Sequence, residues 1–361
     1  MIYITKKMFK ANGIFSDSYP ELRGVNPIFK EIYLPKYLPP KEDTIGSLAI
    51  AGLIHKEVRR RIRPILKPGT SLLDLTLAIE KETMELAKPY HTINKGIGFP
   101  CGLSVNECAA HWAPSSNTTI VIDKDDVIKI DYGIEINGWI IDSAFTISFN
   151  QKYDNLLTAI KEATMQGIKT AGVDVDIHDW SRGIGEVMES YDIILDGKNH
   201  NIRAIETLGG HNILNGIIHG GMFLPAKDLG SKLPSNYRFK EGVYAIETFG
   251  STGSHITKEN GKSTLFRINP NTMSNKISNP KLNTFYSKIY SSFKTLPFCD
   301  RYVETFDSEY EKNLKFLADH NWIHSYPPLC VNKGEYTAQY EHTIMLQDGK
   351  KPIVFSQGED Y

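Results

Sequence analysis

The chain has 361 residues, a formal net charge of −1, 23% charged residues and 41% hydrophobic residues. These values are typical of a globular protein with one large domain or two ordinary ones. The near-neutral charge gives no general attraction to nucleic acid or to anionic lipid. No run of about 18 apolar residues is present, so no membrane span is expected.

The four cysteines form no CxxC pair, which argues against a zinc ribbon or a disulfide scaffold and favours a reducing compartment. The start of the chain, MIYITKKMFK, lacks the apolar core of a secretory signal. We therefore expect a cytoplasmic location.

The N-terminal region reads as an arm followed by two helices. Residues 1–43 show no strong periodicity and contain the proline-rich run LPKYLPP, which should be extended. We interpret 1–43 as an arm that lies on the body of the protein or on a partner. Helices are expected over 44–66, ending at Lys67-Pro68-Gly69, and over 71–86. Four arginines between residues 59 and 63 suit either RNA docking or a solvated helix end, and the helix dipole favours the second interpretation.

The segment 96–114 is rich in glycine, with the sequence GIGFPCGLSVNECAAHWAP. Glycine at this density predicts a loop. The segment also carries Phe99, His111 and Trp112, and loops with placed aromatic and histidine residues often build sites.

A β-hairpin is predicted over 127–149, VIKIDYGIEINGWIIDSAFTISF. Asn137-Gly138 forms its turn because both central residues of a type I′ turn need positive φ. A two-residue turn sets the register, so that Gly133 faces Asp142 and Asp131 faces Ala144. Because side chains alternate along a strand, the two aspartates share one face as diagonal neighbours roughly 7–8 Å apart.

The opposite face of this hairpin is almost wholly apolar and must pack on a core. The aspartate face could simply meet water, as in many half-wet antiparallel sheets. Alternatively, its carboxylates could hold metal ions about 3.5–4 Å apart.

Further along the chain, helices are expected over 154–171 and 178–190. His211 follows two glycines in LGGHN, and His219 follows in IIHGG. Glu247 lies in a strand-like run, VYAIETFGSTG, and Glu341 lies in a second one, YTAQYEHTIML, before a last strand at PIVFS. A carboxylate among apolar strand residues is costly to bury unless it is paired or binds a metal.

The segment 263–326 has a different texture. It opens with an Asn-rich stretch and continues with helix-like runs near 284–293 and 308–320. We predict that it is an inserted helical subdomain, winged-helix-like, within a catalytic domain formed by 44–262 and 327–361.

Five polar residues stand out together: Asp131, Asp142, His211, Glu247 and Glu341. Four carboxylates and one imidazole suit a pair of divalent ions such as Mn(II), Fe(II) or Co(II) better than a thiolate zinc site. Their spacing carries no local motif, so from these residues alone the wet-face and edge-strand interpretations stay open.

Several long stretches of the sequence resemble those of the type 2 methionine aminopeptidases, from about residue 46 to the closing SQGEDY. The matching stretches are GIGFPCGLSVNECAAHWAP, IDYGIEINGWIIDSAFT, GGHN, AIETFGSTG and YPPLC…YTAQYEHTIML. The resemblance implies the pita-bread α/β fold, with two pseudo-symmetric antiparallel half-sheets backed by helices. It also implies a monomeric metallopeptidase that removes the initiator methionine of nascent polypeptides when the second residue is small.

The resemblance also implies a role for each site residue. Asp131 would bind the second metal ion, and His211 and Glu247 the first, while Asp142 and Glu341 bridge the two ions over a shared hydroxide. Glu247 would also be the general base. The remaining positions fall on substrate-facing histidines and on the methionine pocket, and they are Phe99, His111, Ile218, His219 and Tyr326.

The chain departs from the family pattern in two places. The family's Ser-His-Tyr reads Ser263-Thr264-Leu265 here, which predicts the loss of one pocket histidine and a somewhat altered pocket. The long Lys-rich and acidic N-terminal extension of many eukaryotic members has no counterpart before the match, so ribosome association stays an open expectation.

Two rival functions are a non-catalytic pita-bread binding protein and a proline-directed peptidase such as prolidase or aminopeptidase P. The first usually lacks metal ligands, and the second usually carries a large extra N-terminal domain. Cys108 and Cys330 flank elements expected to meet near the site; two buried thiols are favoured over a redox link.

Overall fold

The computed structural model describes residues 43–90, 95–273 and 276–360. The arm predicted for 1–43 lies outside these residues, except for Asp43. Asp43 is the N-cap of the first helix, where its side chain accepts a hydrogen bond from the Gly46 backbone N–H.

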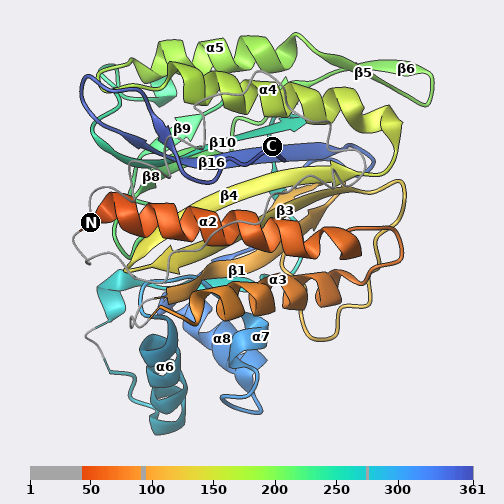
Figure 1. Ribbon diagram of the computed structural model, residues 1–361. Coiled ribbons are helices and arrows are strands. Elements are labelled where there is room, and N and C mark those ends of the chain that lie inside the picture. Colours follow the sequence, from red (N-terminus) through yellow and green to blue (C-terminus); the bar gives the residue numbers. More distant parts are fainter. Residues whose placement is uncertain (1–42, 91–94, 274–275, 361) are drawn as a thin grey trace.

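Two antiparallel sheets form the centre of the molecule (Figure 1). The first has the order β1-β3-β4. The second has the order β17-β16-β10-β8-β9, and β7 also pairs with β10. The strands are β1 (Lys95–Val105), β3 (Val127–Ile136), β4 (Trp139–Ser148), β7 (Arg203–Ala204), β8 (Gly209–Ile213), β9 (Phe223–Pro225), β10 (Gly242–Ser251), β16 (Thr337–Leu346) and β17 (Ile353–Val354).

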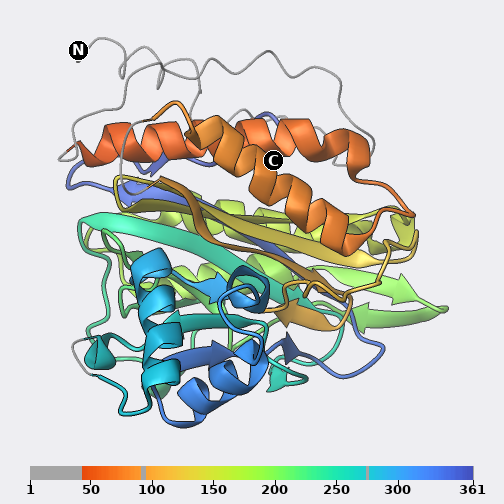
Figure 2. The same cartoon turned by 90° about the horizontal axis from the view of Figure 1, so that it is seen from below.

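Four helices cover the sheets. Helix α2 packs on β3 and β4, α3 on β1, α4 on β10 and β16, and α5 on α4. Figure 2 shows α2 and α3 together on one face of the first sheet. Their bounds are α2 (Thr44–Ile62), α3 (Leu72–Ala87), α4 (Asp154–Thr170) and α5 (Ile177–Glu189), so the four helices predicted here are confirmed to within a few residues. None of the described helices is both long enough and apolar enough to cross a membrane.

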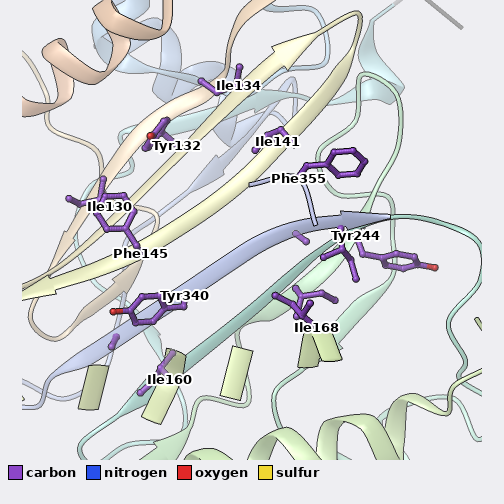
Figure 3. Packing of buried hydrophobic residues seen from close by; sticks show 14 of the residues in the cluster. Ile130, Tyr132, Ile134, Ile141, Phe145, Ile160, Ile168, Tyr244, Tyr340 and Phe355 are labelled. Carbon is purple, nitrogen blue, oxygen red and sulfur yellow. The ribbon is translucent and has the colours of Figure 1, made fainter. Parts of the chain in front are cut away.

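The core between sheets and helices is built by alternate residues of the strands. Ile130, Tyr132 and Ile134 of β3 are at most 2% exposed, and Figure 3 shows them with core residues of the second sheet such as Tyr340. The predicted hairpin and its register are confirmed, with Ile136 opposite Trp139 and Gly133 opposite Asp142. Its aspartate face is also covered, so the interpretation of that face as wet is wrong.

The loop predicted for 96–114 is wrong, because β1 and the short strand β2 (Cys108–Ala110) occupy most of it. The glycines serve close packing. A Cβ on Gly98 would lie 2.9 Å from the Ile140 side chain, and a Cβ on Gly133 of the neighbouring strand would lie 2.3 Å from the Phe99 ring. Register shifts on both sides of Phe99 bend β1 at this point.

The segment predicted as a helical insert contains a sheet as well as helices. The helices are α6 (Pro280–Phe293), α7 (Asp300–Val303) and α8 (Tyr310–Asp319), and the strands β12 (Leu265–Ile268), β13 (Phe298–Cys299) and β14 (Ile323–Tyr326) pair in the order β13-β12-β14. A separate hydrophobic cluster holds it together, centred on residues such as Phe285, Ile289 and Leu317. These short strands were not predicted, because a segment of two to four residues is too short to show the alternating hydrophobic pattern of a strand.

The remaining elements are short. Three-residue 3₁₀ helices occur at Arg63–Ile65, Gln151–Tyr153, Gly230–Lys232 and Pro270–Thr272, and a small hairpin pairs β5 (Asp192–Leu195) with β6 (Lys198–Asn201). A further three-stranded sheet has the order β11-β15-β2, with β11 (Lys258–Glu259) and β15 (Leu329–Cys330). It places Cys330 opposite Cys108, and both thiols are free.

A buried ion pair joins Asp360, the last residue that the structure describes, to Arg59 of helix α2. Asp360 accepts two hydrogen bonds from Arg59, at 2.6 and 2.9 Å, and the two side chains are only 4% and 2% exposed. Arg59 also donates to Nδ1 of His55, so Nε2 of His55 donates to the carbonyls of Tyr132 and Ser143. Through Arg59 and His55, Asp360 is therefore linked to the backbone of β3 and β4, the hairpin that carries the two aspartates.

We expect Asp360→Ala to lower the free energy of unfolding by about 3–5 kcal/mol, because it removes one partner of a buried ion pair. Burial raises the pKa of Asp360, but the charge and hydrogen bonds of Arg59 outweigh burial and hold this pKa below its usual value. The stabilisation is thus present at neutral pH and is lost as pH falls below about 4, through the folded pKa. Urea denaturation measures the change. The exposed neighbour is the control, and Glu359→Ala should change stability by less than about 0.5 kcal/mol.

Candidate metal centre

The first sheet supplies two carboxylates from its hairpin. Asp131 lies opposite Ala144, and Asp142 lies opposite Gly133. The two aspartates therefore project from the same face of adjacent strands, away from the helices. Asp142 is 5% exposed, which is unusual for a carboxylate.

The second sheet supplies the other three candidate ligands. Glu247 of β10 and Glu341 of β16 are direct cross-strand partners, and His211 of β8 lies opposite Ala245. Gly210 makes the close approach of β8 possible, because a Cβ there would lie 2.3 Å from the Ala245 carbonyl oxygen and 3.0 Å from the Glu247 backbone nitrogen. The glycine directly before His211 is therefore needed for the close packing of β8 against β10.

All five predicted ligand residues converge in two overlapping groups. Ligand atoms of Asp142, His211 and Glu341 lie within 4.8 Å of one another, as do those of Asp131, Glu247 and Glu341. Glu341 belongs to both groups, as expected of a bridging residue. Glu247 groups with Asp131, whereas the resemblance assigns it to the ion of His211; that assignment stays a prediction.

His211 is oriented as a metal ligand would be. Its Nδ1 lies 3.3 Å from the Asn212 carbonyl oxygen; in the tautomer whose Nδ1 donates to that carbonyl, Nε2 keeps a lone pair. Nε2 lies 3.3 Å from Oδ2 of Asp142, inside the cluster. A backbone carbonyl on the far nitrogen is the usual way of fixing the tautomer of a ligating histidine.

Hydroxyl groups bridge the two sheets where β4 lies beside β16. The Thr343 hydroxyl accepts from the backbone N–H of Asp142 at 2.8 Å and donates to its carbonyl at 2.7 Å. Ser143 donates to the carbonyl of Glu341 at 2.8 Å. These contacts tie the backbone of a ligand in one sheet to the backbone of a ligand in the other.

The electrostatics of the cluster fit bound cations. Burial raises the pKa of Asp131, Glu247 and Glu341, and each is raised further by neighbouring carboxylates. Both carboxylate oxygens of Glu341 and Oδ1 of Asp131 are buried without a hydrogen-bond partner. Buried oxygens of this kind need a cation or a proton. The residues present therefore fit divalent ions, and their oxygen-rich donor set with one imidazole suits Mn, Fe or Co.

A cavity of about 360 Å³ opens over this cluster. Four of the five candidate ligands line it, while Glu341 is 1% exposed and absent from the lining. The structure also brings all the predicted substrate-facing residues to this cavity, which are Phe99, His111, Ile218, His219 and Tyr326.

The two cavity histidines are held by aromatic contacts, in surroundings that disfavour the charged form of each ring. His111 packs edge-on against Tyr326 at 5.5 Å between ring centroids, and His219 packs edge-on against His211 at 4.4 Å. Burial lowers the pKa of His111 to about 4 and that of His219 well below its usual value. His111 also has a positive φ of 66°, a strained conformation for a non-glycine residue that occurs preferentially at functional sites.

The predicted change at Ser263-Thr264-Leu265 can be located. Leu265 lines the cavity and pairs with Tyr326 across β12 and β14. The hydroxyl of Thr264 instead accepts a hydrogen bond from the Ala113 backbone N–H at 3.2 Å, two residues after His111. The insert therefore contributes an apolar wall to the cavity and a contact behind a cavity histidine.

Sequence reasoning missed Gln339 and Thr343, which contact the candidate ligands directly. Both lie two residues from Glu341, so the period of a strand places them on the same face. That period could have identified both, but neither residue type is an obvious metal ligand.

The sequence matches the profile of Metallopeptidase family M24 over residues 47–248, more than half of the chain. It is 41% identical over 310 residues to Methionine aminopeptidase 2 of Clavispora lusitaniae, covering 85% of this chain and 70% of that protein. It is 43% identical over 313 residues to Methionine aminopeptidase 2 of Komagataella phaffii, covering 85% of this chain and 68% of that protein.

Solved structures share the fold. A thermophilic Arx1 has a TM-score of 0.71 at 18% identity, covering 84% of this chain and 88% of that one. The methionine aminopeptidase of Thermotoga maritima has a TM-score of 0.58 at 16% identity, covering 89% and 99%. The predicted pita-bread α/β fold is confirmed. Together with the sequence identities, this places the chain in metallopeptidase family M24, among the methionine aminopeptidases of type 2.

Proposed function

We propose that this chain, a metal-dependent methionyl aminopeptidase, removes the initiator methionine from nascent proteins and peptides whose second residue is small. The observation that carries the proposal is the convergence of four carboxylates and one imidazole beneath a mostly apolar cavity of about 360 Å³. Neither sheet provides this cluster alone, and the cavity is within the size range of small-ligand sites.

We assign the donors to two divalent ions, of manganese, iron or cobalt. Asp131 would hold one ion and His211 the other, and Glu341, which contributes to both donor groups, would hold both. Asp142 would be the second residue shared by both ions, and Glu247 would hold the ion of His211. When bound, such ions supply Lewis-acid polarisation and activation of a water molecule.

The chain's own groups supply proton transfer and hydrogen bonds. Glu247 is the general base: its carboxylate takes a proton from the attacking water and carries it toward the leaving amine. His219, which lines the cavity beside His211, donates to the oxygen of the scissile carbonyl as charge develops there.

His111 acts at the scissile nitrogen. One of its ring nitrogens donates to the Pro327 carbonyl, so the other nitrogen of the neutral ring keeps a lone pair. That lone pair accepts the N–H of the scissile peptide and orients it, which stabilises the tetrahedral intermediate.

The methionine side chain is assigned to the apolar part of the cavity, where Phe99, Ile218 and Tyr326 lie. An unbranched, polarizable thioether packs well among aromatic rings. Since one methylene changes binding by only roughly 1–3 kcal/mol, discrimination against norleucine should be modest.

We place this activity in the cytoplasm, where the four free thiols are stable. The chain is proposed to act as a monomer, because every residue of the candidate site comes from one chain. Ribosome association stays a prediction. No nucleic-acid partner is proposed for a chain with a formal net charge of −1.

A peptide assay tests the function. Chain stripped with a chelator should be inactive, and Mn(II), Fe(II) or Co(II) should restore cleavage of Met-Ala-Ser, which the appearance of free methionine measures. Met-Leu-Ser should be cleaved at least about 100-fold more slowly, and Ala-Pro dipeptides not at all. A folded chain that cleaves no Met-Ala-Ser with any of the three ions would contradict the proposal, and cleavage of Ala-Pro instead would favour a proline-directed peptidase.

A further inference from the structure

Gln339 is an uncharged side chain placed among the carboxylates of the candidate metal centre. It is 1% exposed and lies on β16 opposite Phe249, diagonal to Glu247 across the β10–β16 pair. Its Nε2 lies 2.6 Å from Oε1 of Glu247 and 3.2 Å from Oδ2 of Asp131. Because a carboxylate oxygen can only accept, both contacts are N–H donations from the amide.

The two acceptors belong to different sheets. Asp131 comes from β3 of the first sheet, and Glu247 from β10 of the second. The Gln339 side-chain amide therefore bridges the two sheets by hydrogen bonds. Hydrogen bonds to charged acceptors are stronger than those between neutral groups, so this bridge orients both carboxylates.

The backbone of Gln339 is itself fixed at the line between the sheets. The Thr146 hydroxyl of β4 accepts from the Gln339 backbone N–H at 2.8 Å and donates to its carbonyl at 2.7 Å. Because its backbone is fixed by these two hydrogen bonds, the Gln339 side chain has little freedom to move with the carboxylates.

Each hydrogen bond from Gln339 occupies one oxygen of a carboxylate and leaves the second oxygen of that carboxylate available. Oδ2 of Asp131 faces Gln339, while Oδ1 is buried without a partner. An amide is suited to this task because it donates without adding charge. A lysine or arginine here would compete with a cation, and a glutamate would add a further repelling carboxylate.

We propose that Gln339 is a positioning residue, which holds one oxygen of Asp131 and one of Glu247 so that their remaining oxygens are presented to the divalent ions. This inference rests on the proposed function for the identity of the ions' site and deepens it. It requires that loss of the amide weakens metal binding and slows the chemical step, without a matching loss of substrate binding.

The test uses Gln339→Met in the full chain, since methionine keeps the volume and removes the donors. We expect Mn(II) to bind about 10–100-fold more weakly by isothermal titration calorimetry, the usual effect of losing a group that orients a metal ligand. At saturating Mn(II), kcat on Met-Ala-Ser should fall about 10–100-fold while KM changes less than about 3-fold. Gln166→Met on helix α4, outside the cavity lining, is the matched control and should change neither value.

The proposal would be overturned if a folded Gln339→Met chain kept both its Mn(II) affinity and its kcat within about 3-fold of the parent. If that variant does not fold by circular dichroism, Thr146→Val decides, because it loosens only the anchor of Gln339 and should still weaken Mn(II) binding at least about 3-fold; unchanged binding would overturn the proposal. Calorimetry does not depend on turnover. A parent chain that binds Mn(II) but cleaves no methionine peptide would refute the proposed function and still leave Gln339 testable.

Discussion

Asp142→Asn should abolish metal binding at physiological concentrations and reduce peptidase activity to below about 1% of the parent. Asp142 is buried, lies 3.3 Å from His211 and belongs to the same group of ligand atoms as Glu341. Its backbone is clamped on both sides by the Thr343 hydroxyl. Asparagine keeps the shape and the clamp but removes the negative charge and turns N–H donors toward the cations, which a metal site cannot accommodate.

Metal content is measured by inductively coupled plasma mass spectrometry after equilibration with Mn(II) and gel filtration. The parent should retain about two ions per chain, and Asp142→Asn fewer than one. Asp348→Asn, in the exposed turn after β16, makes the same chemical change outside the site and should retain both ions. Two ions per chain in folded Asp142→Asn would refute the assignment of Asp142 as a bridging ligand.

His111→Ala should reduce kcat on Met-Ala-Ser by about 100–1000-fold, the usual effect of removing one hydrogen-bonding group aimed at the tetrahedral intermediate. Bound metal should not change, because His111 belongs to neither donor group. His111 is expected to act in its neutral form, since burial lowers the pKa of its ring to about 4. Protonation of His111 should therefore not limit the rate between pH 6 and 8.

The matched control is His200→Ala, in the β5–β6 hairpin and outside the cavity lining. It should keep kcat within about 2-fold of the parent. Thermal unfolding and metal content of His111→Ala should equal those of the parent, which separates a loss of chemistry from a loss of structure. A folded, metal-loaded His111→Ala chain with near-normal kcat would remove His111 from the mechanism.

Local sequence signals predicted those parts of the fold that depend on near neighbours. The Asn137-Gly138 turn sets the register of β3 and β4, because only a few residue types accept positive φ at both positions. The diagonal placement of Asp131 and Asp142 then follows from the strand period. The helix starts at Thr44 and Leu72 follow from the N-caps Asp43 and Ser71, whereas α2 ends at Ile62, four residues before the end expected from Lys67-Pro68-Gly69.

The same local reading was wrong where glycine serves packing between strands. A Cβ on Gly98 of β1 would meet the Ile140 side chain, and a Cβ on Gly133 of β3 would meet the Phe99 ring, so these two glycines mark close contacts between strands and not a loop. Nothing local distinguishes these two uses of glycine, because the difference lies in a neighbour tens of residues away.

By itself, the sequence determined the hairpin, the main helices and, through its resemblance to a family, the identity of the five candidate ligands. Only the tertiary structure decided that these side chains meet, that Gln339 joins two of them across the sheets, and that Leu265 faces the cavity while Thr264 does not. The physical reason is that alternation along a strand sets which face a side chain occupies, whereas its partners depend on how β4 and β16 come together. That docking is made by Ser143, Thr146 and Thr343, whose hydroxyls have no pattern in the sequence.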